Sequence, residues 1–343
     1  MAYIKPLVKS GALALLACYG WLRLRFARGP VLLILTYHRI LPTDAPERKT
    51  EQPGMITSPA LLEQHITLVR KLGATTVHLD EWLEKQSQNR QLPRLAVAIT
   101  FDDGWRDNFE HAFPKLREQN TPATIFLVTR LINSKEIFWP ERVLQLITTE
   151  PIPDEAPEYE WLIPFLPGRR GTKAPLDLQE ADEVITRLKS LSDESIYGHL
   201  RENETAVSKK HQFKEEGRAI LNDQEIAEMA QSGLVKFGAH TRNHYRLNRL
   251  TDPTHLKSEI VGCLEDLRTL GSALVPIFCY PNGDITKGGE ALVRENFKAA
   301  CTTQTGWNIA ASRSPFELHR FNLHDGNSFT NIRFLASLGR GIK

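Results

Sequence analysis

The sequence has little cysteine and almost no net charge. Its four cysteines, Cys18, Cys263, Cys279 and Cys301, are scattered without the spacing of a zinc site. No disulfide framework is indicated, which fits a reducing compartment. A formal net charge of +2 gives no reason to expect bulk nucleic-acid binding, so we expect no nucleic acid among the partners.

The sequence also lacks internal repeats. With 41% hydrophobic and 24% charged residues, the 343-residue chain can bury a full core. We expect one large domain over residues 29–343, interrupted by an insertion at about residues 131–220. The oligomeric state cannot be read from these patterns.

The N-terminus has no apolar run long enough to cross a bilayer. Residues 10–22 are almost wholly apolar, but a helix of 13 residues is only about 20 Å long, against a hydrocarbon layer of roughly 30 Å. Lysines precede this run, arginines follow it, and Tyr19 and Trp21 suit a membrane interface. We therefore expect residues 1–28 to lie on the cytoplasmic face of the inner membrane as a peripheral anchor.

Three alternatives remain for this segment. It can be an uncleaved signal anchor, or Leu15-Leu16-Ala17-Cys18 can be a lipoprotein cleavage site, and in either case the protein is exported and membrane-anchored. A third alternative is a helix that only caps the folded domain.

Two adjacent acids end an apolar run in the first third of the chain. Residues 96–101 predict a buried strand, and Asp102, Asp103 and Gly104 follow it directly. Ligands of α/β folds bind at the carboxyl ends of such strands. Because the strand breaks at Gly104, both carboxylates can reach one cleft, where one binds a metal and the other transfers protons. A turn or a helix cap is the simpler explanation of the same pattern.

A histidine pair follows much later, in His240-Thr241-Arg242-Asn243-His244. A separation of four predicts two imidazoles on one face of a helical turn, and residues 237–239 lead into the pair like a second strand end. Two nitrogens and one carboxylate oxygen form a three-ligand set with open positions, as catalytic metal sites have. We expect one divalent ion, with zinc as the default, and cobalt, nickel or iron(II) would fit the same ligands.

These motifs resemble those of a known family. Thr100-Phe101-Asp102-Asp103-Gly104 and His240-Thr241-Arg242-Asn243-His244 resemble, in order, the first two motifs of the polysaccharide deacetylases, carbohydrate esterase family 4. Phe278-Cys279-Tyr280-Pro281-Asn282-Gly283 resembles the third motif in its Tyr-Pro-x-Gly form, and Thr36-Tyr37-His38-Arg39 resembles the first strand of that branch. The resemblance covers roughly residues 30–335 and implies an α/β fold, a distorted, incomplete (β/α) barrel, that hydrolyses N-acetyl groups of sugars.

The resemblance also assigns roles. It implies that Asp102 is the general base and that Asp103, His240 and His244 are the metal ligands. A backbone N–H near Tyr280 would stabilise the oxyanion.

The substrate site and the general acid are less defined. Tyr280, Pro281 and His38 are the candidates for contact with the substrate and the oxyanion. The late segment from Leu318 to Asp325 offers His319, our choice for the acid, and His324, while His38 at the end of the first predicted strand is a third candidate.

The third motif departs from many relatives at Cys279, where they have an arginine that orients the catalytic carboxylate. A thiol cannot donate the two hydrogen bonds of a guanidinium. We expect either that Arg39, Arg106 or Arg320 takes this role or that the base works without a cation, and that Cys279 is a small buried strand residue.

The expected insertion joins the elements that carry the two metal-binding motifs. It can form a helical lid beside a sugar site, with Trp139, Trp161 and Phe165 as its aromatic residues. We expect packing rather than sugar stacking from these side chains.

Together these observations predict a metal-dependent N-deacetylase. Its substrate would be an N-acetylated sugar of a glycan or a lipid-linked saccharide in cell-surface polysaccharide or lipopolysaccharide assembly. The alternatives are a deformylase or another amide hydrolase of a lipid-linked amino sugar, a catalytically silent sugar-binding module, and a metal-independent membrane scaffold.

Overall fold

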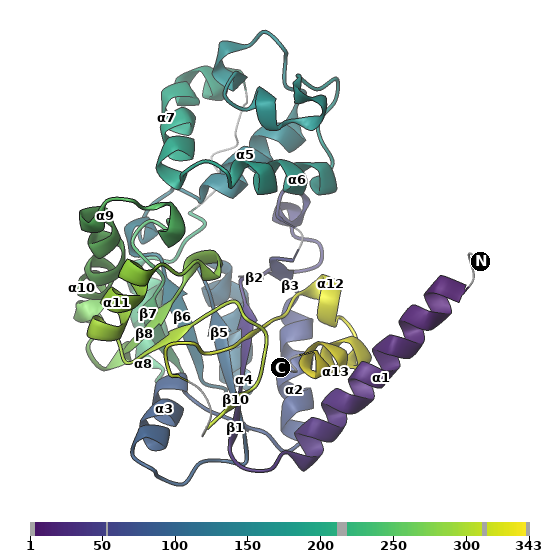
Figure 1. Cartoon of the computed structure of the whole chain (residues 1–343), viewed down its shortest axis with the longest axis vertical. Coiled ribbons are helices and arrows are strands. Elements are labelled where there is room, and N and C mark those ends of the chain that lie inside the picture. The colour runs from purple at the N-terminus through teal and green to yellow at the C-terminus, as the bar shows by residue number, and fades with distance from the viewer. Residues whose placement is uncertain (1–3, 53, 211–217, 311–313, 341–343) are drawn as a thin grey trace.

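A curled, mainly parallel sheet forms the centre of the protein (Figure 1). The computed structural model describes residues 4–52, 54–210, 218–310 and 314–340. The parallel strands follow the spatial order β1 (Val31–Tyr37), β5 (Leu95–Phe101), β6 (Ala123–Leu127), β7 (Val235–Ala239), β8 (Leu274–Cys279) and β9 (Ala299–Cys301). Strands β1, β5 and β6 are buried along their whole length, which explains their continuous apolar sequences.

Short strands complete the edges. β4 (Thr75–Thr76) pairs with β5, β10 (Asn308–Ile309) runs antiparallel to β1, and β2 (Arg39–Ile40) pairs with β3 (Ile56–Thr57) in a separate sheet.

One late segment contacts both ends of the main sheet. Leu318 forms a parallel bridge with Cys301 of β9, and β11 (Phe321–Asn322) pairs with Leu35 and Thr36 of β1. The sheet therefore curls until its two end strands share one neighbour. The predicted distorted, incomplete (β/α) barrel is confirmed.

Alternate residues of the strands face two separate cores. Leu32 and Ile34 of β1 pack with Ala96 and Phe126 inside the barrel. Leu33 and Leu35 belong to a larger core that includes apolar residues of the surrounding helices. The helices that contribute are α2 (Pro59–Lys71), α4 (Phe113–Glu118), α8 (Asp223–Gln231), α9 (Pro253–Lys257), α10 (Cys263–Asp266), α11 (Lys287–Asn296) and α13 (Asn331–Gly339). Helix α3 (Leu79–Ser87) packs on the inner core through Leu79 and Trp82, and the short helix α12 (Asp325–Ser328) precedes α13.

A helical module lies between β6 and β7 in sequence and beyond the carboxyl ends of the strands in space (Figure 1). It contains α5 (Trp139–Thr149), α6 (Leu178–Leu188) and α7 (Asp193–Lys210). Its buried apolar residues, from Trp139 to Leu200, form a hydrophobic cluster of their own. We call it the insertion.

The N-terminal helix α1 (Ile4–Phe26) has 23 residues and is therefore longer than the predicted run of residues 10–22. It packs on α13, and its N-terminal part extends past the rest of the molecule (Figure 1). A β-carbon on Gly20 would lie 2.2 Å from the Leu335 carbonyl oxygen, and one on Gly339 would lie 2.3 Å from the Leu16 carbonyl oxygen. The close contact between α1 and α13 therefore requires both glycines. Among the described residues, no helix is both long enough and apolar enough to span a membrane.

Candidate active site

Both acids after β5 point into one cavity, as the sequence predicts. Asp102 and Asp103 are buried, and both line the same cavity at the carboxyl ends of the strands. Asp103 has a φ of +75° and Gly104 a φ of +78°, so the chain turns sharply after β5. A β-carbon on Gly104 would lie 2.8 Å from Leu127 Cδ2, which explains the glycine.

The histidine pair lies in a loop after β7 and not on a helical turn, so this prediction was wrong. Thr241 and His244 adopt left-handed backbone conformations, with φ of +64° and +59°, which no α-helix contains. The loop nevertheless directs both imidazoles to one acid. Nε2 of His240 and Nε2 of His244 each lie 3.4 Å from Asp103 Oδ1.

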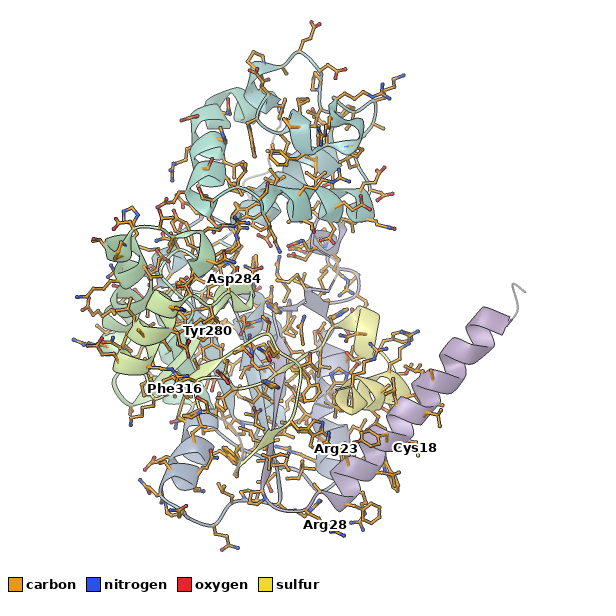
Figure 2. The ribbon with its side chains drawn as sticks, viewed as in Figure 1. Cys18, Arg23, Arg28, Tyr280, Asp284 and Phe316 are labelled. Carbon is orange, nitrogen blue, oxygen red and sulfur yellow. The ribbon has the colours of Figure 1, made fainter. Side chains whose placement is uncertain are left out.

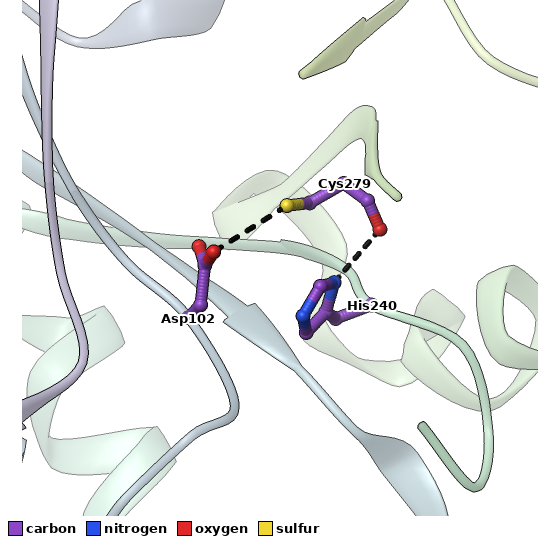
Figure 3. Close-up of side chains that lie close together, drawn as sticks. All are labelled: Asp102, His240 and Cys279. Carbon is purple, nitrogen blue, oxygen red and sulfur yellow. Dashed lines mark hydrogen bonds between the residues drawn. The ribbon is translucent and has the colours of Figure 1, made fainter. Parts of the chain in front are cut away.

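These three side chains fit a metal ion. Ligand atoms at about 2.1 Å from a common ion, at tetrahedral angles, are roughly 3.4 Å apart. Two of these side chains are also fixed by hydrogen bonds on their second polar atom: His240 Nδ1 donates to the Cys279 carbonyl oxygen at 2.7 Å (Figure 3), and Trp105 Nε1 donates to Asp103 Oδ2 at 2.9 Å. Such outer contacts orient metal ligands and leave one free atom of each for the ion.

The protonation states of two of these residues agree with this assignment. Burial lowers the pKa of His244 to about 4, so its imidazole is neutral near pH 7. Burial alone would raise the pKa of Asp103, but the hydrogen bond with His240 and the electrostatic interactions with the His244 and His38 imidazoles outweigh it and hold the pKa below its ordinary value. A neutral imidazole and an ionised carboxylate are the forms that bind metals.

Arg320 holds the second acid, Asp102. Its two terminal nitrogens donate to the two carboxylate oxygens at 2.7 and 2.8 Å, a bidentate pair between fully buried side chains. Burial raises the pKa of Asp102, but the Arg320 charge and hydrogen bonds, with His240 and His38 nearby, bring the net pKa below its ordinary value. Asp102 is therefore an ionised carboxylate that can accept a proton.

The other two candidate arginines have different partners. Arg39 pairs with Asp107 and Glu51, each at 2.7 Å, and Arg106 pairs with Glu225 at 2.9 Å. Cys279 is a buried strand residue whose thiol lies 3.6 Å from Asp102 Oδ2 (Figure 3). Of the three candidate arginines, Arg320 is therefore the one that contacts Asp102.

The three histidines named as possible acids lie in different places. Among the described residues that line the cavity, His38 and His324 are present and His319 is not. His38 Nε2 lies 3.8 Å from Asp102 Oδ2, whereas His319 is buried against Gly306. His324 caps α12 through its Nδ1, which accepts from the Gly326 N–H. The geometry favours His38 over His319 for contact with a substrate.

Tyr280 cannot supply the oxyanion hydrogen bond from its own N–H, because this group donates to the Cys301 carbonyl oxygen at 3.1 Å. Pro281 has no N–H to donate. Tyr280 and Asn282 do line the cavity. The site of an oxyanion donor in this loop stays a prediction, but Tyr280 N–H is ruled out.

The insertion forms one wall of the cavity, whose volume is about 520 Å³. Trp139, Glu141, Lys189 and Asp193 line it together with the metal-binding residues. Asp193 accepts hydrogen bonds from Trp139 Nε1 at 2.8 Å and from the backbone N–H of Arg246 at 2.7 Å, two residues after His244. This buried contact joins the insertion to the histidine loop, and no sequence spacing indicated it.

The aromatic residues of the insertion mostly pack, as expected. Trp161 stacks on His199 with ring centroids 5.2 Å apart, and Phe165 packs against the apolar cluster of the insertion. Trp139 belongs to this cluster and also reaches the cavity wall.

The chain is similar to known proteins both in sequence and in fold. The sequence model of the family described as polysaccharide deacetylase matches residues 89–157 and 193–296, about half of the chain. The Bacillus subtilis protein YxkH, whose name refers to the same family, is 30% identical over 84 residues, which are 24% of this chain and 30% of that protein. This chain therefore matches less than a third of that relative.

Two solved structures share the fold. The deacetylase PplD of Streptococcus pyogenes, solved in complex with acetate, aligns with a TM-score of 0.58 at 19% identity, covering 91% of this chain and 99% of that one. IcaB of Ammonifex degensii aligns with a TM-score of 0.57 at 17% identity, covering 90% and 98%.

Proposed function

Because the chain belongs to the polysaccharide deacetylase family, we propose that it removes the N-acetyl group from an amino sugar of a glycan or lipid-linked saccharide. The observation that carries the proposal is the convergence of Asp103, His240 and His244 beside the Asp102–Arg320 pair. Acetate, the molecule bound in the PplD complex, is the product expected here.

We propose that Asp103, His240 and His244 hold one divalent ion, with zinc as the default and cobalt, nickel or iron(II) as alternatives. Such an ion acts as a Lewis acid on a carbonyl oxygen and lowers the pKa of water. Asp102, kept ionised by Arg320, takes the proton from the attacking water. His38, which lines the same cavity, can then deliver a proton to the departing amine.

The lipid-linked substrate is the finer part of the proposal. An enzyme that docks through residues 1–28 on the cytoplasmic face of the inner membrane would meet lipid-linked saccharides during assembly. The lysines and arginines around residues 10–22 support this side of the membrane. An exported, membrane-anchored form is the alternative.

The main rival is a deformylase of a lipid-linked amino sugar, which the same residues could support. A catalytically silent sugar-binding module is a second rival, which the missing arginine of the third motif and the undefined general acid would favour. The bidentate contact of Arg320 with Asp102 speaks against the first of these two arguments.

The test is incubation of the purified protein with N-acetylhexosamine glycans and lipid-linked precursors, followed by mass spectrometry and by assays for acetate and formate. We expect loss of an acetyl mass and release of acetate. Asp102→Asn should abolish turnover while the metal stays bound. Formate release would establish the deformylase, and no turnover of any compound by metal-loaded protein would contradict the proposal.

A further inference from the structure

Helix α1 has two apolar sides, and only one of them packs against the rest of the protein. Ala17, Gly20 and Leu24 are buried at the contact with α13. On another side, Leu15, Tyr19, Leu22 and Phe26 follow one another at intervals of four, three and four residues, and their exposed fractions are 74%, 39%, 41% and 65%. This spacing places them in one stripe along the helix. We call these four residues the outer stripe.

Exposed apolar side chains concentrate on α1 and beside α13. Within the described part of the chain, nine large apolar side chains are exposed, and seven of them lie here: the outer stripe, Trp21, Phe329 and Ile332. Phe329 comes just before α13, and Ile332 lies in its first turn. A concentration of this kind marks an interaction surface, whereas single exposed apolar residues are ordinary.

The two segments that form this surface carry charges of one sign. The sequence contains no Asp or Glu in residues 1–43 or in residues 326–343. Arg25 and Arg28 are exposed on and just after α1, and the Arg333 guanidinium lies 4.6 Å from the centre of the Phe329 ring. Figure 2 shows Arg23 and Arg28 along the last part of α1, with Cys18 further toward its N-terminus.

We propose that α1 and the start of α13 form one docking surface for an anionic lipid bilayer, with the outer stripe inserted at the interface. Apolar side chains, interfacial Tyr and Trp, and arginines in segments that carry no acidic residues are the combination that binds anionic membrane surfaces. The glycine crossing at Gly20 and Gly339 fixes α1 to the barrel. The bilayer therefore contacts the folded domain itself and not a tether, and this conclusion does not depend on the hydrolase activity.

The test is cosedimentation of the full-length protein with vesicles of phosphatidylcholine alone or mixed with phosphatidylglycerol. We expect binding to the mixed vesicles that weakens as salt is added. Leu15→Ser and Phe26→Ser should each reduce binding roughly tenfold or more, because each removes an apolar side chain that would insert into the bilayer. Ile332→Ser should reduce it as well, which a surface made of α1 alone would not predict.

Ile285→Ser is the matched control, since Ile285 is exposed and lies between β8 and α11, away from α1 and α13. This variant should bind vesicles as the unmodified protein does, and melting temperatures will show that all variants fold. Wild-type binding by folded Leu15→Ser and Phe26→Ser would overturn the proposal. The proposal would also be overturned if the protein did not bind mixed vesicles and formed dimers through α1 in sedimentation velocity. Deacetylation of a soluble substrate, measured on the same samples, keeps this outcome separate from that of the enzymatic proposal.

Discussion

At the scale of single residues, the protonation of Asp102 depends on one cation. Asp102 and Arg320 are 218 residues apart in the chain, and both are buried. Without a cation, burial would favour the neutral carboxylic acid. Arg320 reverses this preference and lowers the pKa of Asp102. The base is thus ready to accept a proton at neutral pH only as long as the pair is intact.

Removing this cation should change the pH dependence of the reaction. In Arg320→Ala the pKa of Asp102 rises, so the acidic limb of the plot of kcat/KM against pH moves upward by roughly one to three pH units. Arg320→Lys keeps the charge but loses the bidentate geometry, and its limb should move less. Because a broken buried pair also costs about 3–5 kcal/mol of stability, melting temperatures must accompany the rate profiles. An unchanged profile in folded Arg320→Ala would exclude this role.

The sequence identified the acids and the histidines because each set follows a strongly apolar strand end. It did not identify the conformation that brings the histidines together, since a spacing of four also suits a helix. The structure decides between a helix and a loop, because Thr241 and His244 have left-handed backbone conformations. Arg320 was one of three candidates, because its position depends on pairing between segments far apart in sequence.

At the scale of elements, His65 connects three of them. It lies on α2, its Nδ1 accepts from the Tyr37 hydroxyl of β1, and its Nε2 donates to the Ser328 carbonyl oxygen, both at 3.0 Å. Its ring stacks on Phe334 of α13 with centroids 4.4 Å apart. Burial lowers its pKa to about 4, so the folded protein contains the neutral ring.

This histidine should make the protein less stable in mild acid. The unfolded chain, with a His pKa of about 6.5, binds more protons than the folded one between about pH 6.5 and pH 4. The free energy of unfolding should therefore fall by about 3 kcal/mol as the pH decreases through this window, and stay level above it.

Denaturant titrations at several pH values test this expectation. His65→Phe, which cannot ionise, should flatten the dependence. Equal slopes for His65→Phe and the unmodified protein would show that other groups are responsible.

The apolar runs predicted the central strands well, because buried parallel strands are apolar throughout. An N-terminal helix was expected within residues 1–28, and α1 extends on both sides of the apolar run of residues 10–22. The contacts between the insertion and the histidine loop could not be predicted, because loop residues show no hydrophobic periodicity.

At the scale of the whole molecule, one ion pair joins the insertion to the metal-binding loop. Asp193 lies at the start of α7, and its carboxylate also accepts from Arg246 Nε at 3.0 Å. Both side chains are buried, at 2% and 4% exposure. The position of the cavity wall relative to His244 therefore depends on this contact.

Asp193→Ala should leave the Arg246 guanidinium buried and unpaired, at a cost of about 3–5 kcal/mol. We expect a lower melting temperature, faster limited proteolysis of the insertion and reduced kcat/KM. Glu194→Ala changes the neighbouring exposed acid and should alter stability by less than about 0.5 kcal/mol. If the two variants behave alike, the contact does not hold the insertion in place.

Arg320 lies on the segment between Leu318 and Asn322 that pairs with both β9 and β1. During synthesis this segment leaves the ribosome after all three metal ligands. A nascent or proteolytically clipped chain that ends before it would still contain Asp103, His240 and His244, but its Asp102 would lack the Arg320 guanidinium. Such a chain would also lack Phe321 and Phe334 of the core, so activity would report that translation of the barrel had reached its last strand.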